Sequence, residues 1–202
     1  MIKVKETGLY TSIQDLGRPQ WHSLGIPNAG VMDAESAKTA NMLLQNKLDC
    51  SVLEITMTGP ILQFTSPSWV AFSGAQMPIY IDQSKSLQNT PIWIKAGQEI
   101  HFGKLEQGFR LYMAIKGGFK TTPVLGSQSM CKNVTPSFML KKGMELIHET
   151  GIKDQEVFIK LETETPLNSK HIKVFEGPEY LKLSPSQKTA IEKQVFTVSN
   201  LN

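Results

Sequence analysis

A polar segment near the amino terminus, residues 11–33, carries side chains that could bind an anionic or amide substrate. Its amide, charged and imidazole groups stand among three glycines and are Gln14, Asp15, Arg18, His22, Asn28 and Asp33. Arg18 could clamp a carboxylate or phosphate through paired hydrogen bonds, and Asp15 could orient it or act as a base. A simpler interpretation is that Asp15 and Arg18 pair with each other and cap backbone groups in a tight turn.

Polar residues also interrupt apolar strands farther along the chain. In RLYMAIK, residues 110–116, a period of two places Arg110 and Tyr112 on one face, which could be a pocket wall or a solvated surface. Glu54 lies within the apolar stretch VLEIT, so it either faces water or is buried and paired, and burial would raise its pKa. Gly74 belongs to a Ser-Gly-Ala turn that could offer backbone N–H groups.

These positions define one predicted cleft between the amino-terminal loop and the strand faces. The candidate catalytic residues are Asp15, Arg18 and Glu54, and the candidate substrate-binding residues are Gln14, Arg110, Tyr112 and Gly74. No metal is expected, because the four histidines and two cysteines show no metal-ligand spacing. No phosphate-loop motif and no biotin-carrying Met-Lys-Met sequence occurs. Any biotin would therefore have to arrive on another chain, and if ATP is used, its phosphate loop is not recognisable in this sequence.

Composition argues against several classes of protein. The chain has 202 residues, of which 19% are charged, and a net charge of +3 with no run of Lys or Arg, so nucleic acid is not an expected partner. The first residues form no apolar signal region, and no apolar run approaches the roughly 18 residues of a membrane span. We therefore expect a reduced, cytoplasmic protein with no membrane partner.

Short apolar stretches with alternating faces dominate the sequence, at the spacing typical of an all-β barrel or sandwich. They lie at 2–5, 52–55, 61–64, 69–72, 78–81, 91–94, 99–102, 110–116, 144–147, 156–162 and 171–175. Helical spacing and capping residues predict two helices, over 33–47 and 184–194. The predicted fold is mainly β, a barrel with one main helix.

A polar stretch that contains proline, residues 163–170, is typical of a linker. It predicts a first domain over 1–168 and the beginning of a second domain over 169–202. The second part carries a strand, a capped helix and a further strand, which are too few elements to close a barrel.

Several motifs follow one another in a distinctive order. The first comprises Gly8, Thr11, Gln14, Asp15, Gly17, Arg18, Gly25, Ile26, Gly30 and Asp33. Residues 53–64 read LEITMTGPILQF, residues 73–75 read SGA, residues 97–118 fit GxxxxFG and GxRxYxAxxGG, and residues 124–127 read VLGS. This set resembles the biotin-dependent carboxyltransferase family, whose members are also known as allophanate hydrolase subunit 2 or as the C subunit of 5-oxoprolinase. Gln128 and Met130 depart from the Arg and Thr of its VLGSRST motif.

The resemblance implies a cyclophilin-like β-barrel that full-length members contain twice, so we expect this chain to be truncated at its carboxyl end. It also implies a subunit of a bacterial ATP-dependent 5-oxoprolinase, which opens pyroglutamate, a small amide, with subunit-A-like and subunit-B-like partners. One alternative is a non-catalytic module that sequesters a subunit-B-like inhibitor of a sensor kinase. Another is the carboxyltransferase part of a urea carboxylase or allophanate system. Whether the chain is itself an enzyme stays open among these.

The carboxyl-terminal segment yields a prediction about assembly. Its apolar residues are Ile172, Val174, Phe175, Ile191, Val195 and Phe196. Because two strands alone are marginal in water, we predict that the segment docks on the first domain or pairs with a second copy to form a homodimer. Light scattering should then show a dimer for the whole chain but not for a chain that ends at Asn168. A strictly monomeric whole chain with a protease-sensitive tail would contradict both forms of the prediction.

Overall fold

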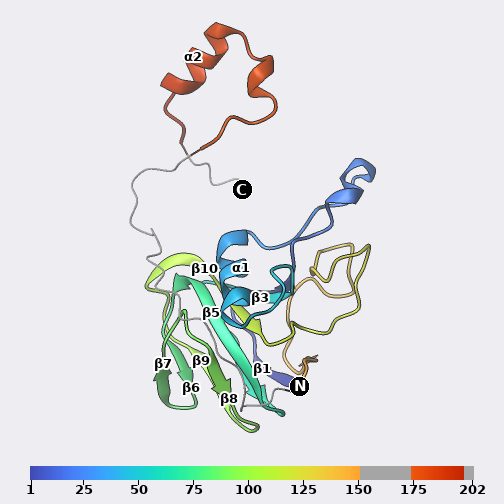
Figure 1. The fold of residues 1–202 in the computed structure, drawn as a ribbon, viewed down its shortest axis with the longest axis vertical. Coiled ribbons are helices and arrows are strands. Elements are labelled where there is room, and N and C mark those ends of the chain that lie inside the picture. Colours follow the sequence, from blue (N-terminus) through green and yellow to red (C-terminus); the bar gives the residue numbers. More distant parts are fainter. Residues whose placement is uncertain (151–173, 198–202) are drawn as a thin grey trace. The chain divides into compact units, whose positions relative to one another are not determined.

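The computed structural model describes residues 1–150 and 174–197 (Figure 1). By their internal contacts, residues 1–167 and 168–202 form two compact units, which are described separately below. Neither described helix is long and apolar enough to cross a membrane. The strand predicted at 156–162 lies outside the described residues.

The first unit contains two antiparallel sheets. The six-stranded sheet runs in the order β11 (Glu145–Leu146), β1 (Ile2–Glu6), β4 (Ile61–Phe64), β9 (Glu99–Phe102), β6 (Ile79–Ile81) and β7 (Ser84–Ser86). The five-stranded sheet runs in the order β2 (Tyr10–Gln14), β3 (Val52–Thr56), β10 (Gln107–Ile115), β5 (Ser68–Gln76) and β8 (Ile92–Ile94). The mainly β prediction is confirmed by this arrangement.

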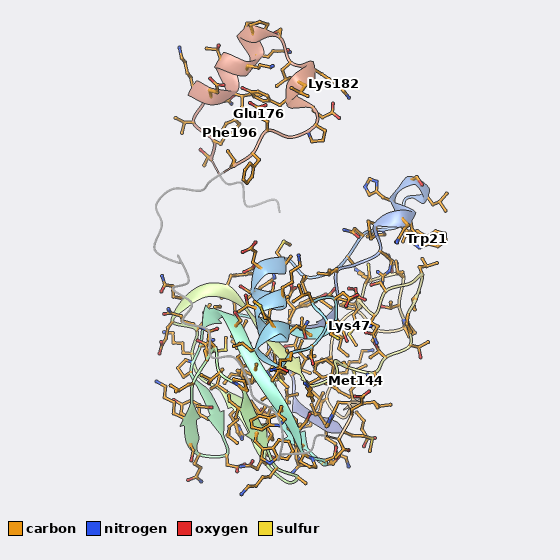
Figure 2. The ribbon with its side chains drawn as sticks, in the orientation of Figure 1. Trp21, Lys47, Met144, Glu176, Lys182 and Phe196 are labelled. Atoms are coloured by element: carbon orange, nitrogen blue, oxygen red, sulfur yellow. The ribbon has the colours of Figure 1, made fainter. Side chains whose placement is uncertain are left out.

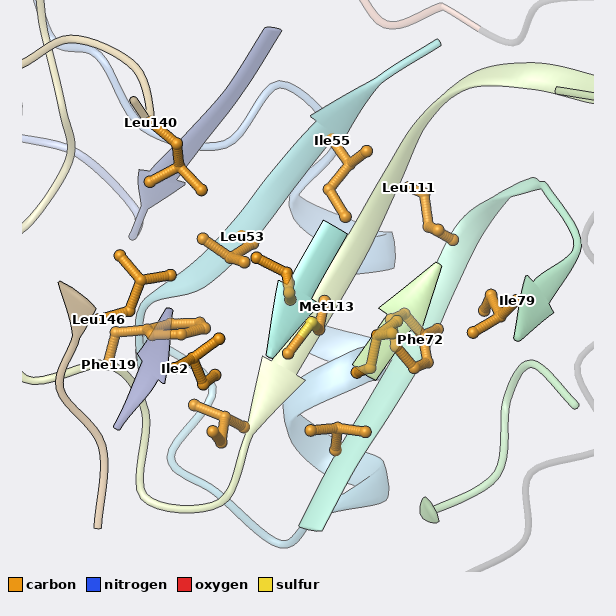
Figure 3. Close-up of a cluster of buried hydrophobic side chains, with 14 of the residues drawn as sticks. Ile2, Leu53, Ile55, Phe72, Ile79, Leu111, Met113, Phe119, Leu140 and Leu146 are labelled. Atoms are coloured by element: carbon orange, nitrogen blue, oxygen red, sulfur yellow. The ribbon is translucent and has the colours of Figure 1, made fainter. Parts of the chain in front are cut away.

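Alternate residues from both sheets fill one hydrophobic core (Figure 3). Leu53, Leu111 and Met113 contribute from the five-stranded sheet, and Ile2 and Ile79 from the six-stranded sheet, all at most 1% exposed. Because successive strand residues point to opposite faces, the same alternation leaves the other face of the five-stranded sheet for different contacts.

Helix α1 (Ala34–Leu43) packs on that other face, against Val52, Ala71, Tyr112 and Ala114. Asp33 caps it as predicted, since its Oδ1 accepts a hydrogen bond from the Ser36 N–H at 3.0 Å. The predicted helix over 33–47 is too long. Gln45 takes a left-handed φ of 51°, which ends the helical path.

The closed barrel is the main correction to the predicted architecture. Among the described residues, strands pair only within their own sheet, so the body is two facing sheets with separate edges. Strand β2 was not predicted either, because its polar residues were assigned to the amino-terminal loop. These polar residues alternate with Thr11 and Ile13 and lie on the outer face of the five-stranded sheet.

The second unit contains η2 (Tyr180–Lys182) and α2 (Pro185–Lys193) in its described part. The predicted capping box is confirmed: Ser184 Oγ accepts from the Gln187 N–H at 3.4 Å, and Gln187 Oε1 accepts from the Ser184 N–H at 2.9 Å. The predicted flanking strands are not found at 174–175 and 195–197, where no β ladder forms among the described residues. The rest of each predicted strand lies outside the described ranges.

His148 is buried at the edge of the core and packs against the Phe64 ring, with ring centroids 5.9 Å apart. Its Nδ1 donates to the Glu149 carbonyl oxygen at 2.6 Å, and its Nε2 lies 3.3 Å from Ser66 Oγ. Burial lowers the pKa of His148, because it penalises the charged imidazolium more than the hydrogen bond to Glu149 favours it.

We predict that His148 makes the protein less stable in mild acid. The unfolded chain takes up a proton near pH 6.5 that the folded chain resists, so the free energy of unfolding should fall as the pH drops below about 6.5, by at most about 1.4 kcal/mol per pH unit. Urea unfolding at pH 7.5 and pH 5.5 measures this change. The His148→Asn variant should be less stable at pH 7.5 but should lose most of the slope. An unchanged slope would show that His148 is not its source.

Candidate functional site

The outer face of the five-stranded sheet carries two adjacent polar rows. In register, Ser12 on β2 lies opposite Glu54 on β3, which lies opposite Tyr112 on β10. The next row contains Tyr10, Thr56 and Arg110. Helix α1 covers the apolar part of this face, so the polar rows lie beside the beginning of the helix.

Glu54 is only 6% exposed and is surrounded by hydrogen-bond donors. Its Oε2 accepts from the Tyr112 hydroxyl at 2.8 Å and from the Met32 backbone N–H at 2.7 Å. The Tyr112 oxygen in turn accepts from the Asp33 N–H at 2.8 Å. We call Glu54, Tyr112, Arg110 and these two N–H groups the Glu54 cluster. Of the two sequence-based alternatives for Glu54, the buried and paired one holds.

Tyr112 remains a hydrogen-bond donor throughout the physiological range. Burial raises the pKa of its hydroxyl far above the ordinary value, and the nearby Glu54 carboxylate raises it further.

Gly74 packs closely against the Tyr112 ring, in a space that leaves no room for a side chain. A Cβ at Gly74 would lie 3.2 Å from Tyr112 Cδ2 and 2.7 Å from the Arg110 carbonyl oxygen, and Gly74 has a φ of +103°. Gly74 therefore belongs to the packing of the cluster.

Arg110 is the accessible member of the Glu54 cluster. Its Nε lies 3.4 Å from Glu54 Oε1, an ion pair without the alignment of a hydrogen bond. The Arg110 side chain is 28% exposed, whereas that of Glu54 is 8% exposed. The guanidinium also lies over the Phe109 ring, 5.2 Å from its centroid. A ligand could therefore reach the guanidinium more readily than the carboxylate behind it.

Asp15 forms a second cluster, which joins the amino-terminal loop to residues 124–129. Its Oδ1 accepts from the hydroxyls of Ser127 and Ser129, both at 2.6 Å, and from the Gly17 N–H at 2.8 Å. Its Oδ2 accepts from the Gln128 N–H at 2.6 Å. With four donors around it, this carboxylate fixes two loops together, and we call the arrangement the Asp15 latch.

Arg18 is completely buried beside the latch. Its Nη2 donates to the Ser129 carbonyl oxygen at 2.5 Å and its Nε to the Val124 carbonyl oxygen at 3.3 Å. Its Nη1 has no hydrogen-bond partner among the described residues. The simpler interpretation was that Asp15 and Arg18 pair with each other and cap backbone groups. No ion pair joins them in the described part of the chain, but both side chains do bond to backbone groups.

Gln14 lies between the two clusters. Its Nε2 donates to Ser12 Oγ at 2.9 Å and to the Met130 carbonyl oxygen at 3.0 Å, and its Oε1 accepts from the Gly30 N–H at 3.1 Å. The predicted residues thus fall into two groups. Glu54, Arg110, Tyr112 and Gly74 come together directly, whereas Asp15 and Arg18 bond to the loop at 124–129.

Sequence patterns did not reveal the donors that hold the carboxylates. Ser127 and Ser129 are separated by one residue, a spacing that puts two hydroxyls on the same side of an extended segment. That spacing was the available signal for the latch. The backbone N–H groups of Met32 and Asp33 leave no trace in residue type and could be found only from the fold.

A hollow of about 280 Å³ lies elsewhere, at the edge of the six-stranded sheet. It is lined by Lys3, Val4, Lys5, Lys142, Gly143 and Glu145, and none of the predicted site residues lines it. Within residues 1–150 and 174–197, no group of three or more His, Cys, Asp or Glu side chains could hold a metal ion.

Two named proteins show the similarity of this chain to known sequences. The C subunit of 5-oxoprolinase from Escherichia coli strain K12 is 28% identical over 204 residues, which cover 99% of this chain and 65% of that protein. The urea amidolyase of Lachancea kluyveri is 35% identical over 128 residues, 63% of this chain and 7% of that protein. The chain therefore spans less than two thirds of the length of either relative.

Solved structures show the same fold. The urea amidolyase of K. lactis superimposes with a TM-score of 0.69 and 33% identity, over 72% of this chain and 9% of that chain. The protein TTHA0988 superimposes with a TM-score of 0.72 over 80% of this chain and 61% of its own, and at 24% identity this likeness concerns the fold alone.

The match to a family extends over most of the sequence. Residues 24–202 fit the carboxyltransferase domain, subdomain A and B. This span includes both polar strands of the Glu54 cluster and the loop that holds the Asp15 carboxylate. The chain belongs to the carboxyltransferase domain family, subdomain A and B.

Proposed function

We propose that this protein is the subunit-C-like component of an ATP-dependent amide-processing enzyme of 5-oxoprolinase type. It would open pyroglutamate to glutamate together with subunit-A-like and subunit-B-like partners. The observation that carries the proposal is the similarity to the C subunit of E. coli 5-oxoprolinase along 99% of this chain. ATP would be used by the assembled complex. We also propose that the two-sheet body is related to the cyclophilin-like fold.

Arg110 is the residue that we assign to the substrate. Pyroglutamate carries a carboxylate, and a guanidinium edge is the side-chain group best suited to bind one. The more buried Glu54 carboxylate forms an ion pair with Arg110, and the Tyr112 hydroxyl and the Met32 N–H donate hydrogen bonds to Glu54. Glu54 and Tyr112 would thus act as positioning residues. Asp15 and Arg18 would shape the loop beside the site through the latch.

One observation favours a second function, a regulatory module that binds a subunit-B-like protein without catalysis. Both candidate carboxylates are engaged: Asp15 accepts four hydrogen bonds, and Glu54 accepts two beside the Arg110 ion pair. A general base needs a free oxygen within reach of the substrate proton. The similarity to urea amidolyase keeps a urea-directed carboxyltransferase as a further alternative.

Reconstitution of the complex tests the proposed activity. The chain is mixed with the subunit-A-like and subunit-B-like proteins of the same organism, and ATP hydrolysis is measured with and without 5-oxoproline. We expect hydrolysis that depends on 5-oxoproline and on all three proteins. Arg110→Gln should lower kcat/KM roughly tenfold or more, because a hydrogen bond to a charged group contributes about 1.5–3 kcal/mol. Lys104→Gln, at an exposed position between β9 and β10, is the matched control.

The other outcomes separate the alternatives. Tight binding of the subunit-B-like protein without 5-oxoproline-dependent hydrolysis would support the regulatory module. Stimulation by urea in place of 5-oxoproline would support the urea branch. Equal loss of activity in Arg110→Gln and Lys104→Gln would remove Arg110 from the site.

The Glu54 cluster also predicts a stability effect. Tyr112→Phe deletes one donor to the buried Glu54 and the acceptor of the Asp33 N–H, so the free energy of unfolding should fall by about 1–3 kcal/mol. Tyr80→Phe, on β6 of the other sheet, is the control and should change it by less than about 0.5 kcal/mol. Denaturant unfolding measures both. Equal effects of the two substitutions would show that the cluster adds no stability of its own.

A further inference from the structure

The outer face of the five-stranded sheet holds a buried hydroxyl that makes no hydrogen bond. Thr56 is the last residue of β3 and is only 7% exposed. Its Oγ1 has no hydrogen-bond partner among the residues that the structure describes. A buried hydroxyl without a partner destabilises the folded chain, because folding removes the water to which it would otherwise bond. Its presence on this face therefore needs a reason.

Thr56 lies in the middle of a polar row, between Tyr10 on β2 and Arg110 on β10, and is opposite both of them in register. Residues that lie opposite each other on neighbouring strands share one face of the sheet, with Cβ atoms about 4.5–5.5 Å apart. Figure 1 labels β3 and β10, and Figure 2 adds the side chains of the first unit in the same orientation. The hydroxyl is thus the neighbour of the guanidinium that we assign to the substrate carboxylate.

Neither neighbour in the row bonds to the Thr56 hydroxyl. The Tyr10 hydroxyl donates to the Phe138 carbonyl oxygen at 3.0 Å. Arg110 Nε lies 3.4 Å from Glu54 Oε1 and, within the described part of the chain, has no hydrogen-bond partner either. One hydroxyl and one N–H at adjacent positions of the same row therefore both lack a bond that a ligand at Arg110 could supply.

A second threonine shows that the missing hydrogen bond is not sufficient evidence by itself. Thr11 on β2 is 1% exposed, and its Oγ1 also lacks a partner among the described residues. Thr11, however, lies opposite Ile55, whose side chain belongs to the core between the two sheets. Of the two threonines, only Thr56 combines an unbonded hydroxyl with a charged neighbour that a ligand can reach.

We propose that Thr56 Oγ1 is the amide-binding group of this site, whose ligand is a small molecule with both a carboxylate and an amide. Arg110 binds the carboxylate, and the hydroxyl, which can donate and accept, bonds to the amide. The Arg110 side chain is long and 28% exposed, so it can shift as the carboxylate engages it and uncover the hydroxyl beside it. The inference rests on the proposed function for the identity of the ligand, 5-oxoproline.

Steady-state kinetics of the reconstituted complex test the amide-binding role. Thr56→Val replaces the hydroxyl with a methyl group of similar shape, so kcat/KM for 5-oxoproline should fall about tenfold through the loss of one hydrogen bond. Thr56→Ser keeps a hydroxyl and should stay within about threefold of the unchanged protein. Thr11→Val is the matched control, because it removes an unbonded buried hydroxyl from the opposite face, and it should stay within about twofold.

A ligand analogue separates an amide contact from a general change of shape. Cyclopentanecarboxylate has a five-membered ring and a carboxylate but no amide. Its inhibition constant should agree within about twofold between the unchanged and Thr56→Val complexes, because it offers the hydroxyl no partner in either. Arg110→Gln should weaken both ligands, since both carry the carboxylate. Thermal melting of the Thr56→Val chain should match or exceed that of the unchanged chain, because the substitution removes an unbonded buried hydroxyl.

The outcomes distinguish this inference from the proposed function. If the unchanged complex shows no 5-oxoproline-dependent hydrolysis, the proposed function fails and the inference fails with it. If hydrolysis is present and Thr56→Val behaves like Thr11→Val, the function stands and Thr56 is not a binding residue. An equal weakening of 5-oxoproline and cyclopentanecarboxylate by Thr56→Val, or a lower melting temperature than that of Thr11→Val, would also overturn the inference. A loss confined to 5-oxoproline supports it.

Discussion

The buried carboxylate of Glu54 is the constraint on which the outer face of the five-stranded sheet depends. A buried carboxylate is costly unless donors or positive charge surround it, and the groups around Glu54 come from two separate parts of the chain. Tyr112 and Arg110 reach it from β10, and the Met32 N–H reaches it from the segment just before α1. The single acidic side chain thereby fixes the beginning of α1, because the Asp33 N–H binds the same tyrosine oxygen.

Glu54 fixes the segment just before α1, and the Asp15 latch fixes the beginning of the amino-terminal loop. It joins a segment near the amino terminus to one more than a hundred residues later, and Arg18 is buried against the same segment. Loops that carry binding residues are often held in this way by a rigid scaffold. Here two carboxylates that look catalytic in the sequence are used to hold backbone and side-chain donors in place.

Most strands could be predicted because their residues alternate or lie in short apolar runs. The stretches at 61–64 and 99–102 match β4 and β9, and Asp33 and Ser184 both cap helices as expected. β2 was missed because its outward residues are polar. They belong to the same sheet face as Glu54, but in the sequence they resemble the composition of a loop. The helix end near Leu43 depends on Gln45 and on Asn46, whose side chain bonds to Ile115 and Gly117, contacts that no local pattern contains.

The position of β1 between β4 and β11 in the six-stranded sheet affects how the chain folds as it is made. β1 pairs with β4 and also with β11, so its second partner is synthesised about 140 residues after it. At typical elongation rates of about 5–20 residues per second, this interval is on the order of ten seconds. During that time the growing chain exposes an apolar strand edge next to Ile2 and Val4. Until β11 emerges, such an unpaired edge is open to pairing with another chain.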